Sequence, residues 1–242
     1  RQAGVCGGRG GSQHLAYRHF HSNGVQGGMT GIGVGIAFSL KRSAEGAVVA
    51  AMIGDGTLGE GMLYETLNLA AIWQLPMLFV VENNGIAQTT YTKDTIGGEI
   101  EARGRAFGLD TWRLSDDAAD FSTRVEDIVT DVRDRQEPGF LVIDTRRLGP
   151  HSKGDDLRDA AEKAAIRERD PLTKLGMSLP EPVRTAIDER NQTYLDSIKE
   201  AANASPEARE EAPPEDIFTQ ATRTPAVSYP EPEERLGGCA RN

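Results

Sequence analysis

One alternation of apolar runs constrains the fold more than any other part of the chain. Two short apolar runs, residues 47–53 and 77–81, flank a helix-like stretch at 61–73. Short apolar runs on either side of a helical pattern are typical of a strand–helix–strand unit, in which the two strands lie parallel. The segment therefore predicts a parallel β-sheet with at least one covering helix.

Polar residues follow both of these predicted strands. The first strand ends in Gly54-Asp55-Gly56, and 26 residues then separate Gly56 from Asn83-Asn84 after the second strand. Ligands bind at the carboxyl ends of strands in open α/β sheets. A carboxylate and an amide can together supply oxygen ligands to Mg²⁺, which completes its octahedron with water and substrate phosphate. Asp-Gly and Asn-Asn-Gly are also common turn sequences, so each motif alone is weak, and their combination predicts a metal-bridged phosphate cofactor.

The remaining pattern extends this α/β reading. Apolar strands alternate with helices, which predicts a parallel sheet with helices on both faces. The expected helices are 29–42, 61–73, 100–107, 121–136, 158–169 and 181–203, and the expected strands are 47–53, 77–82, 109–114 and 140–145. Residues 1–28 and 85–98 are expected to be loops.

The chain divides into three parts by composition. Residues 1–175 are expected to form the α/β domain, and 176–203 a helical extension. Residues 204–242 are acidic, rich in proline and poor in apolar side chains, which predicts an extended or disordered tail.

The overall charge and the cysteines exclude several classes. The 242 residues carry a formal net charge of −10, and no basic patch suits a nucleic acid. No apolar run approaches the ~20 residues that a membrane-spanning helix needs. Cys6 and Cys239 show no disulfide-framework spacing, so two free thiols in a reducing cytoplasm are expected.

A glycine-rich stretch raises a dinucleotide alternative. Gly31, Gly33 and Gly35 open a predicted helix, and Asp55 lies 20 residues after Gly35. That fingerprint needs a strand directly before the glycines, which residues 19–28 do not provide, and it leaves Asn83-Asn84 unexplained. Each helical glycine costs ~1 kcal/mol relative to alanine, so close packing against a neighbour is the favoured explanation. The same small-residue helix is a candidate for close contact with another subunit.

The motif GDG-x₂₆-NN resembles the thiamine diphosphate signature. The surrounding sequence is similar to the α subunit of the decarboxylating component of 2-oxo acid dehydrogenases, the pyruvate, branched-chain and acetoin type. This resemblance covers about residues 1–175 and implies a transketolase-like, thiamine diphosphate-binding fold. It rests on GRGGSQHL at 8–15, SNGVQGGMTGIGVGIA at 22–37, GDGTLGEGMLYETLNLAAIWQLPMLFVVENN at 54–84 and PHSKGDD at 150–156.

Two departures from the family pattern stand out. Gly154 replaces a serine of the family's phosphorylatable loop, which weakens a phosphorylation hypothesis for that loop. Family members also have about a hundred residues before GRGGSQH, including a Tyr-Arg pair that binds the diphosphate. The expectation is that this region is either absent from this sequence or supplied by another polypeptide.

The resemblance assigns roles to individual residues. It implies that Mg²⁺ is bound by the side chains of Asp55 and Asn84 and by the backbone carbonyl of Ile86. It implies further that the backbone N–H groups of Gly56 and Thr57 bind the diphosphate, consistent with anion binding near a helix N-terminus. Gly24 and Gln26 would offer backbone groups to the aminopyrimidine ring.

Two histidines receive candidate catalytic roles from the same resemblance. His151 matches the active-site histidine of a mobile loop that contacts the diphosphate or the bound intermediate, where a group titrating near neutral pH suits proton transfer. His14 would line the substrate channel. The alternatives are a solvated loop histidine for His151 and a metal site formed by His14, His19 and His21, which lacks a cysteine or carboxylate at matching spacing.

The implied activity is decarboxylation of a 2-oxo acid followed by reductive acylation of a lipoyl group on a separate acyltransferase. No acidic residue of this chain matches the glutamate that engages the aminopyrimidine, which the family's β subunit provides. An α₂β₂ heterotetramer that is inactive without β is therefore expected. Two alternatives remain open: a split transketolase-like enzyme that transfers a two-carbon ketol unit, and a non-catalytic assembly homologue.

Overall fold

A four-stranded parallel sheet forms the centre of the molecule. The computed structural model describes residues 13–43, 46–152 and 154–207. The strand order is β3 (Val49–Gly54), β4 (Met77–Asn83), β8 (Gly139–Asp144) and β7 (Asp110–Ser115), and every neighbouring pair is parallel. The α/β fold expected from the sequence is confirmed.

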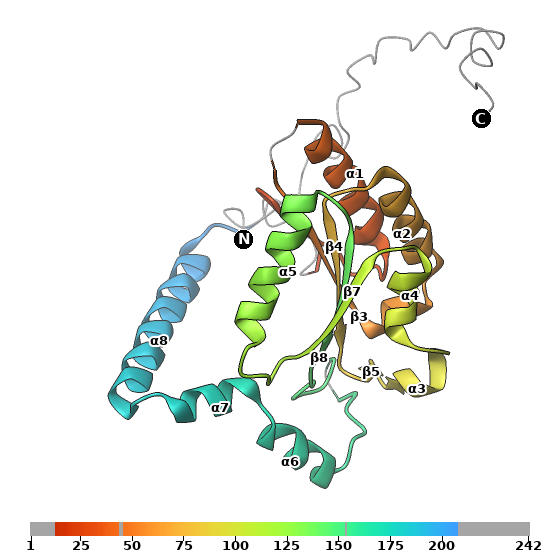
Figure 1. Ribbon diagram of the computed structural model, residues 1–242. Helices are drawn as coiled ribbons and strands as arrows, with labels where there is room; N and C mark the ends of the chain where they lie inside the picture. The colour runs from red at the N-terminus through yellow and green to blue at the C-terminus, as the bar shows by residue number, and fades with distance from the viewer. Residues whose placement is uncertain (1–12, 44–45, 153, 208–242) are drawn as a thin grey trace, which may run out of the picture.

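Helices cover both faces of this sheet (Figure 1). α1 (Gly28–Ser43), α2 (Gly61–Trp73) and α4 (Ile100–Ala106) lie on one face, and α5 (Phe121–Arg135) lies on the other. Because side chains alternate along a strand, β4 contributes to two hydrophobic clusters. Phe79 and Val81 join the cluster under α1 and α2, whereas Leu78 and Val80 join the cluster under α5.

Close packing accounts for the helix-propensity cost of only some of the glycines in α1. A Cβ at Gly33 would lie 2.9 Å from the Met77 Cε, so this glycine permits a close approach to β4. Gly31 has only ordinary contact distances around it, and Gly35 faces open space within the described structure. The close packing expected from the sequence is therefore confirmed at Gly33.

Several short elements lie where the sequence predicted loops. The segment 1–28 contains the hairpin of β1 (Leu15–Tyr17) and β2 (Phe20–Ser22), and the segment 85–98 contains β5 (Ile86–Ala87), β6 (Thr90–Tyr91) and α3 (Thr92–Thr95). The loop expectation was wrong there, because strands of two or three mostly exposed residues carry no readable apolar alternation. A 3₁₀ helix, η2 (Asp55–Gly59), follows β3.

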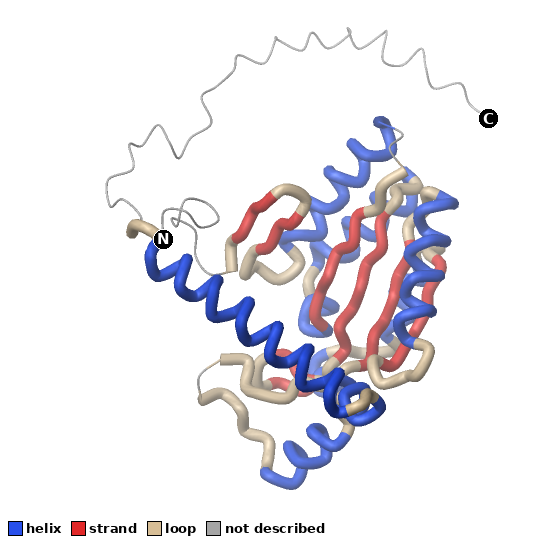
Figure 2. Tube along the Cα trace, turned by 90° about the vertical axis from the view of Figure 1, so that its left-hand side faces the viewer, coloured by secondary structure: helices blue, strands red, loops and turns tan. Residues whose placement is uncertain are grey.

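The last described helices are α6 (Ala160–Glu168), α7 (Pro171–Ser178) and α8 (Glu181–Ala204), and α8 buries none of its residues. They start below the carboxyl ends of the strands, at α6, and end with α8 on the side of the molecule that carries α5 (Figures 1 and 2). α7 was not expected from the sequence. Cys6, Cys239 and residues 208–242 of the expected tail lie outside the described residues. In the portion that is described, no helix is both long and apolar enough to cross a membrane.

Candidate active site

The buried carboxylate of Asp55 lies at the carboxyl end of β3. Asp55 begins η2 and is 2% exposed. Its Oδ2 accepts a hydrogen bond of 2.8 Å from the backbone N–H of Gly85 and one of 2.6 Å from the Thr92 hydroxyl. A buried carboxylate needs such donors, because an unpaired buried charge is strongly unfavourable. Asp55 is therefore held by the chain that follows the neighbouring strand.

That following chain is a tight hairpin after β4. Gly85 adopts a φ of +79°, a conformation that favours glycine, and its carbonyl accepts a hydrogen bond of 3.0 Å from the Thr92 backbone N–H. The Asn84 Oδ1 accepts a 3.0 Å hydrogen bond from the backbone N–H of Ile86, as in an Asx turn. Asn84 thus acts as a turn former in this structure, and its amide oxygen still has a second lone pair for a ligand.

The donors gathered at these two strand ends fit Mg²⁺ chemically. A carboxylate of Asp55, the amide oxygen of Asn84 and a backbone carbonyl at Ile86 are all hard oxygen ligands. Both hydrogen bonds to Asp55 go to Oδ2, and within the described residues none goes to Oδ1. Within the described part of the chain, no three histidines, cysteines or carboxylates are grouped so that they could hold a metal ion. The alternative metal site of His14, His19 and His21 is therefore not formed.

Gly56 permits a close approach between η2 and β5. A Cβ at this position would lie 2.8 Å from the Ala87 Cβ and 3.1 Å from the Gln26 Oε1. Gln26, which is distant in sequence, therefore lies beside Gly56. Thr57, the next residue of η2, is 4% exposed.

A basic cavity of about 340 Å³ opens beside Asn84 and Ile86. Its lining includes four arginines and one glutamate: Arg146, Arg147, Arg158, Arg169 and Glu162. The Arg147 Nε donates to the Gly149 carbonyl at 3.1 Å, whereas its Nη2 is buried without a hydrogen-bond partner in the described structure. An unmet buried donor costs about 1–3 kcal/mol, more when it is charged. The unpaired Nη2 of this guanidinium group fits an anionic ligand such as a diphosphate.

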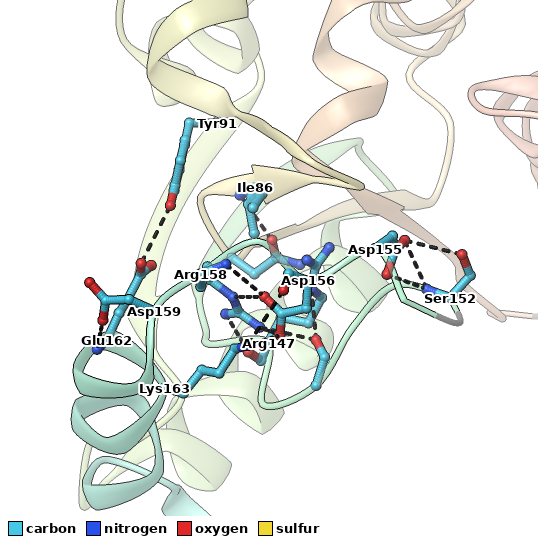
Figure 3. Close-up of polar contacts among 12 residues, drawn as sticks. Ile86, Tyr91, Arg147, Ser152, Asp155, Asp156, Arg158, Asp159, Glu162 and Lys163 are labelled. Atoms are coloured by element: carbon cyan, nitrogen blue, oxygen red, sulfur yellow. Dashed lines mark hydrogen bonds and ion pairs between the residues drawn. The ribbon is translucent and has the colours of Figure 1, made fainter.

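Arg158 holds together the loop after β8 that contributes Arg146 and Arg147 (Figure 3). Its side chain is buried, bonds the carbonyls of Arg147 and Gly149 at 2.7 and 3.1 Å, and pairs with Asp156 at 2.8 Å. Hydrogen bonds from Arg158 hold the pKa of Asp156 well below its usual range. Near the loop tip, Asp155 accepts the backbone N–H and the hydroxyl of Ser152, and these bonds lower the pKa of Asp155.

The structure places the predicted residues in two groups. Asp55, Gly56, Thr57, Asn84, Ile86 and Gln26 converge on the ends of β3 and β4. Three others lie on exposed segments: His14 just before β1, Gly24 just before α1, and His151 on the loop closed by Arg158. Their roles stay predictions.

A second polar network, which includes Asn83, was not predicted from the sequence. Asp144 ends β8 opposite Asn83 and accepts its side-chain N–H at 2.7 Å. Arg113 donates to both Asp144 oxygens, at 2.7 and 2.8 Å, and to Glu101 at 3.0 Å. Burial alone would raise the pKa of Asp144, but the hydrogen bonds from Arg113 and Asn83 outweigh it and lower that pKa. The sequence did offer one signal for this network, because Asp144 lies at the carboxyl end of a predicted strand.

Thr92 and Arg147 were also missed. Thr92 reaches Asp55 because the β5–β6 hairpin folds back toward β3. Arg147 lies in a loop whose backbone Arg158 holds by a hydrogen bond to the Arg147 carbonyl. Neither loop conformation has a signature in the sequence.

Comparison with known proteins places the chain in a family. Residues 2–217 match the model of the family described as "Dehydrogenase E1 component". The pyruvate dehydrogenase E1 component subunit alpha of Rickettsia bellii is 29% identical over 91% of this chain and 70% of its own length. The Zymomonas mobilis protein of the same name is 31% identical over 86% and 62%, and the chloroplastic alpha-3 subunit of Arabidopsis thaliana is 33% identical over 89% and 55%.

The chain thus spans between 55% and 70% of the length of these three relatives. The family match favours the dehydrogenase over the transketolase-like and assembly alternatives. It also agrees with the four-stranded parallel sheet. This chain belongs to the dehydrogenase E1 component family, the thiamine diphosphate-dependent family that its sequence motifs resemble.

Proposed function

We propose that this chain is the α subunit of a thiamine diphosphate-dependent 2-oxo acid dehydrogenase. The observation that carries the proposal is the buried Asp55 carboxylate, held by the turn after Asn84, beside a cavity lined by Arg147, whose Nη2 is unpaired within the described residues. A metal-bridged diphosphate matches both halves of that arrangement, since the oxygens suit Mg²⁺ and the guanidinium suits phosphate.

We assign the binding of the metal and the diphosphate to the following residues. Asp55, Asn84 and the Ile86 carbonyl hold Mg²⁺. When bound, thiamine diphosphate supplies the nucleophilic carbon and the electron sink for decarboxylation. The diphosphate is bound by backbone N–H groups at Gly56 and Thr57, and Arg147 neutralises its charge.

The remaining residues orient the reacting end. Gly24 and Gln26 position the aminopyrimidine ring, and the approach of Gln26 to Gly56 supports this placement. His151 sits on the loop that lines the cavity, where it exchanges protons with the bound substrate. His14 lines the path by which the 2-oxo acid enters.

The partner proposals follow from the family match. A β subunit supplies the glutamate that engages the aminopyrimidine, in an α₂β₂ heterotetramer, and a lipoylated acyltransferase receives the acyl group. The substrate is a small 2-oxo acid, and neither nucleic acid nor membrane is a partner. The protein works in the cytoplasm, which the spacing of its two cysteines supports.

The decisive experiment uses the intact protein co-expressed with its β subunit. Calorimetric titration with thiamine diphosphate and Mg²⁺ should show saturable binding that Asp55→Ala abolishes, because the carboxylate is the only charged ligand proposed for the metal. Asp94→Ala, which removes an exposed carboxylate from nearby α3, is the matched control. Normal cofactor binding by Asp55→Ala would refute the metal assignment.

The activity is tested in the same complex. We expect release of CO₂ from pyruvate or a branched 2-oxo acid and no turnover of a ketose phosphate. The opposite result would support the transketolase-like alternative instead.

A further inference from the structure

The hydroxyl group of Thr92 is directed at the carboxylate proposed to bind the metal. Thr92 begins α3, yet this helix has no side-chain cap at its N-terminus. Its Oγ1 instead donates to the Asp55 Oδ2 at 2.6 Å, across 37 residues of chain. Threonine hydroxyls near helix starts usually bond the local backbone, so this long-range bond is a distinct use of the group.

Thr92 is one corner of a closed ring of three hydrogen bonds. Its backbone N–H binds the Gly85 carbonyl at 3.0 Å, and the Gly85 N–H binds the Asp55 Oδ2 at 2.8 Å. The third bond is the one from the Thr92 hydroxyl. Since two donors share one carboxylate oxygen, they restrict rotation of the carboxylate about its Cβ–Cγ bond. The other oxygen, Oδ1, is thereby held in a defined direction.

This restriction matters for Mg²⁺ more than for most cations. Mg²⁺ demands near-ideal octahedral geometry with oxygens at ~2.0–2.1 Å, so a rotating carboxylate binds it poorly. Groups that orient a metal ligand typically change metal affinity ~10–100-fold when removed. The Gly85 N–H cannot be deleted without disturbing the turn, because proline would require a φ of about −65° where Gly85 has +79°, whereas the Thr92 hydroxyl can be removed alone.

We propose that Thr92 is a positioning residue that orients the Asp55 carboxylate for Mg²⁺ and so sets the affinity of the site for the metal. The inference rests on the proposed function, because it requires Asp55 to be a metal ligand. It assigns Thr92 no contact with cofactor or substrate.

The test compares four variants of the intact protein co-expressed with its β subunit. Thr92→Val removes the hydroxyl at nearly constant volume, Thr92→Ala removes it without added apolar bulk, and Thr92→Ser restores it. Thr95→Val is the matched control, because Thr95 lies on the same short helix and makes only a 3.5 Å bond to the Thr92 carbonyl. The readout is the Mg²⁺ concentration at half-maximal retention of thiamine diphosphate, with Mn²⁺ electron paramagnetic resonance reporting the geometry of the bound ion.

Thr92→Val and Thr92→Ala should both raise that Mg²⁺ concentration roughly 10–100-fold and broaden the Mn²⁺ spectrum. Thr92→Ser and Thr95→Val should stay within about twofold of the wild type. Wild-type affinity in Thr92→Val or Thr92→Ala would overturn the positioning role alone, as would equal losses in Thr92→Ser. Absence of Mg²⁺-dependent cofactor binding in the wild type would instead overturn the proposed function, and the inference with it.

Discussion

Substitution of Gly56 by alanine probes the joint between η2 and β5. The new Cβ would lie 2.8 Å from the Ala87 Cβ, whereas carbon atoms pack best at about 3.5–4.0 Å. The two atoms must separate by about 1 Å, and neither can rotate away because each is fixed to backbone. Overpacking of this kind costs about 1–3 kcal/mol. At ~2–4 °C per kcal/mol for a domain of this size, the melting temperature should fall by several degrees.

The larger effect should be on the site. Displacing β5 also displaces Ile86, which precedes Ala87 and is proposed to bind the metal through its carbonyl. A misplacement of ~1 Å near reacting groups can lower the rate by ~10²-fold. The assay is thermal melting without cofactor, followed by cofactor titration and CO₂ release in the co-expressed complex.

Gly59→Ala is the control for this experiment, because a Cβ there would meet only the Ile96 Cδ1, at an ordinary 3.9 Å. Adding Ala87→Gly to Gly56→Ala should restore most of the melting temperature, since it removes the nearest clashing atom and leaves only the flexible end of Gln26, at 3.1 Å, to move aside. If Gly56→Ala melts and binds cofactor like Gly59→Ala, the close approach of η2 to β5 does not govern the site.

Three further predictions concern the charged groups around the site. Arg147→Met should weaken thiamine diphosphate binding at least tenfold in titrations yet leave the cofactor-free melting temperature unchanged or higher, because an unpaired buried Nη2 is removed; a lower melting temperature with intact binding would contradict this. Asp156→Asn should lower the melting temperature near neutral pH: a depressed pKa means that the pairing with Arg158 stabilises the fold above the ordinary aspartate range, so the difference from wild type should shrink as pH falls below that range and vanish only as pH falls through the depressed pKa. A difference that does not shrink below the ordinary aspartate range would rule out the ion pair as its source. Arg113→Lys should cost about 1 kcal/mol in urea denaturation, because lysine keeps the charge but loses the fork on the partly exposed Asp144; an unchanged denaturation midpoint would show that the fork contributes nothing.

The central fold could be predicted because its periodicities are long and unambiguous. The helix 61–73 was predicted with the bounds that the structure shows, and β4 ends one residue beyond its predicted end. β4 and β8 are buried on both faces, so they read as continuous apolar runs, and their short length and flanking turn residues identify them as strands. The hairpin β1–β2 was missed because most of its side chains are exposed, so burial imposed no pattern on them.

The site was predictable only as far as the sheet determines it. Asp55 and Asn84 follow parallel neighbouring strands, so their proximity follows from sheet geometry. Thr92 and Arg147 depend on how loops fold back, which is decided by single bonds such as those of Gly85 and Arg158. These bonds have no periodic signature in the sequence.

The three-bond ring of Asp55, Gly85 and Thr92 also bears on the order in which the site assembles. Its bonds between Asp55 and the hairpin span only 30 and 37 residues, whereas the bond from Asn83 to Asp144 spans 61. Contacts of low sequence separation cost less loop entropy and form sooner. Closing the ring around Asp55 should therefore cost about 0.6 kcal/mol less loop entropy than closing the bond between the ends of β4 and β8, because the loop is about half as long.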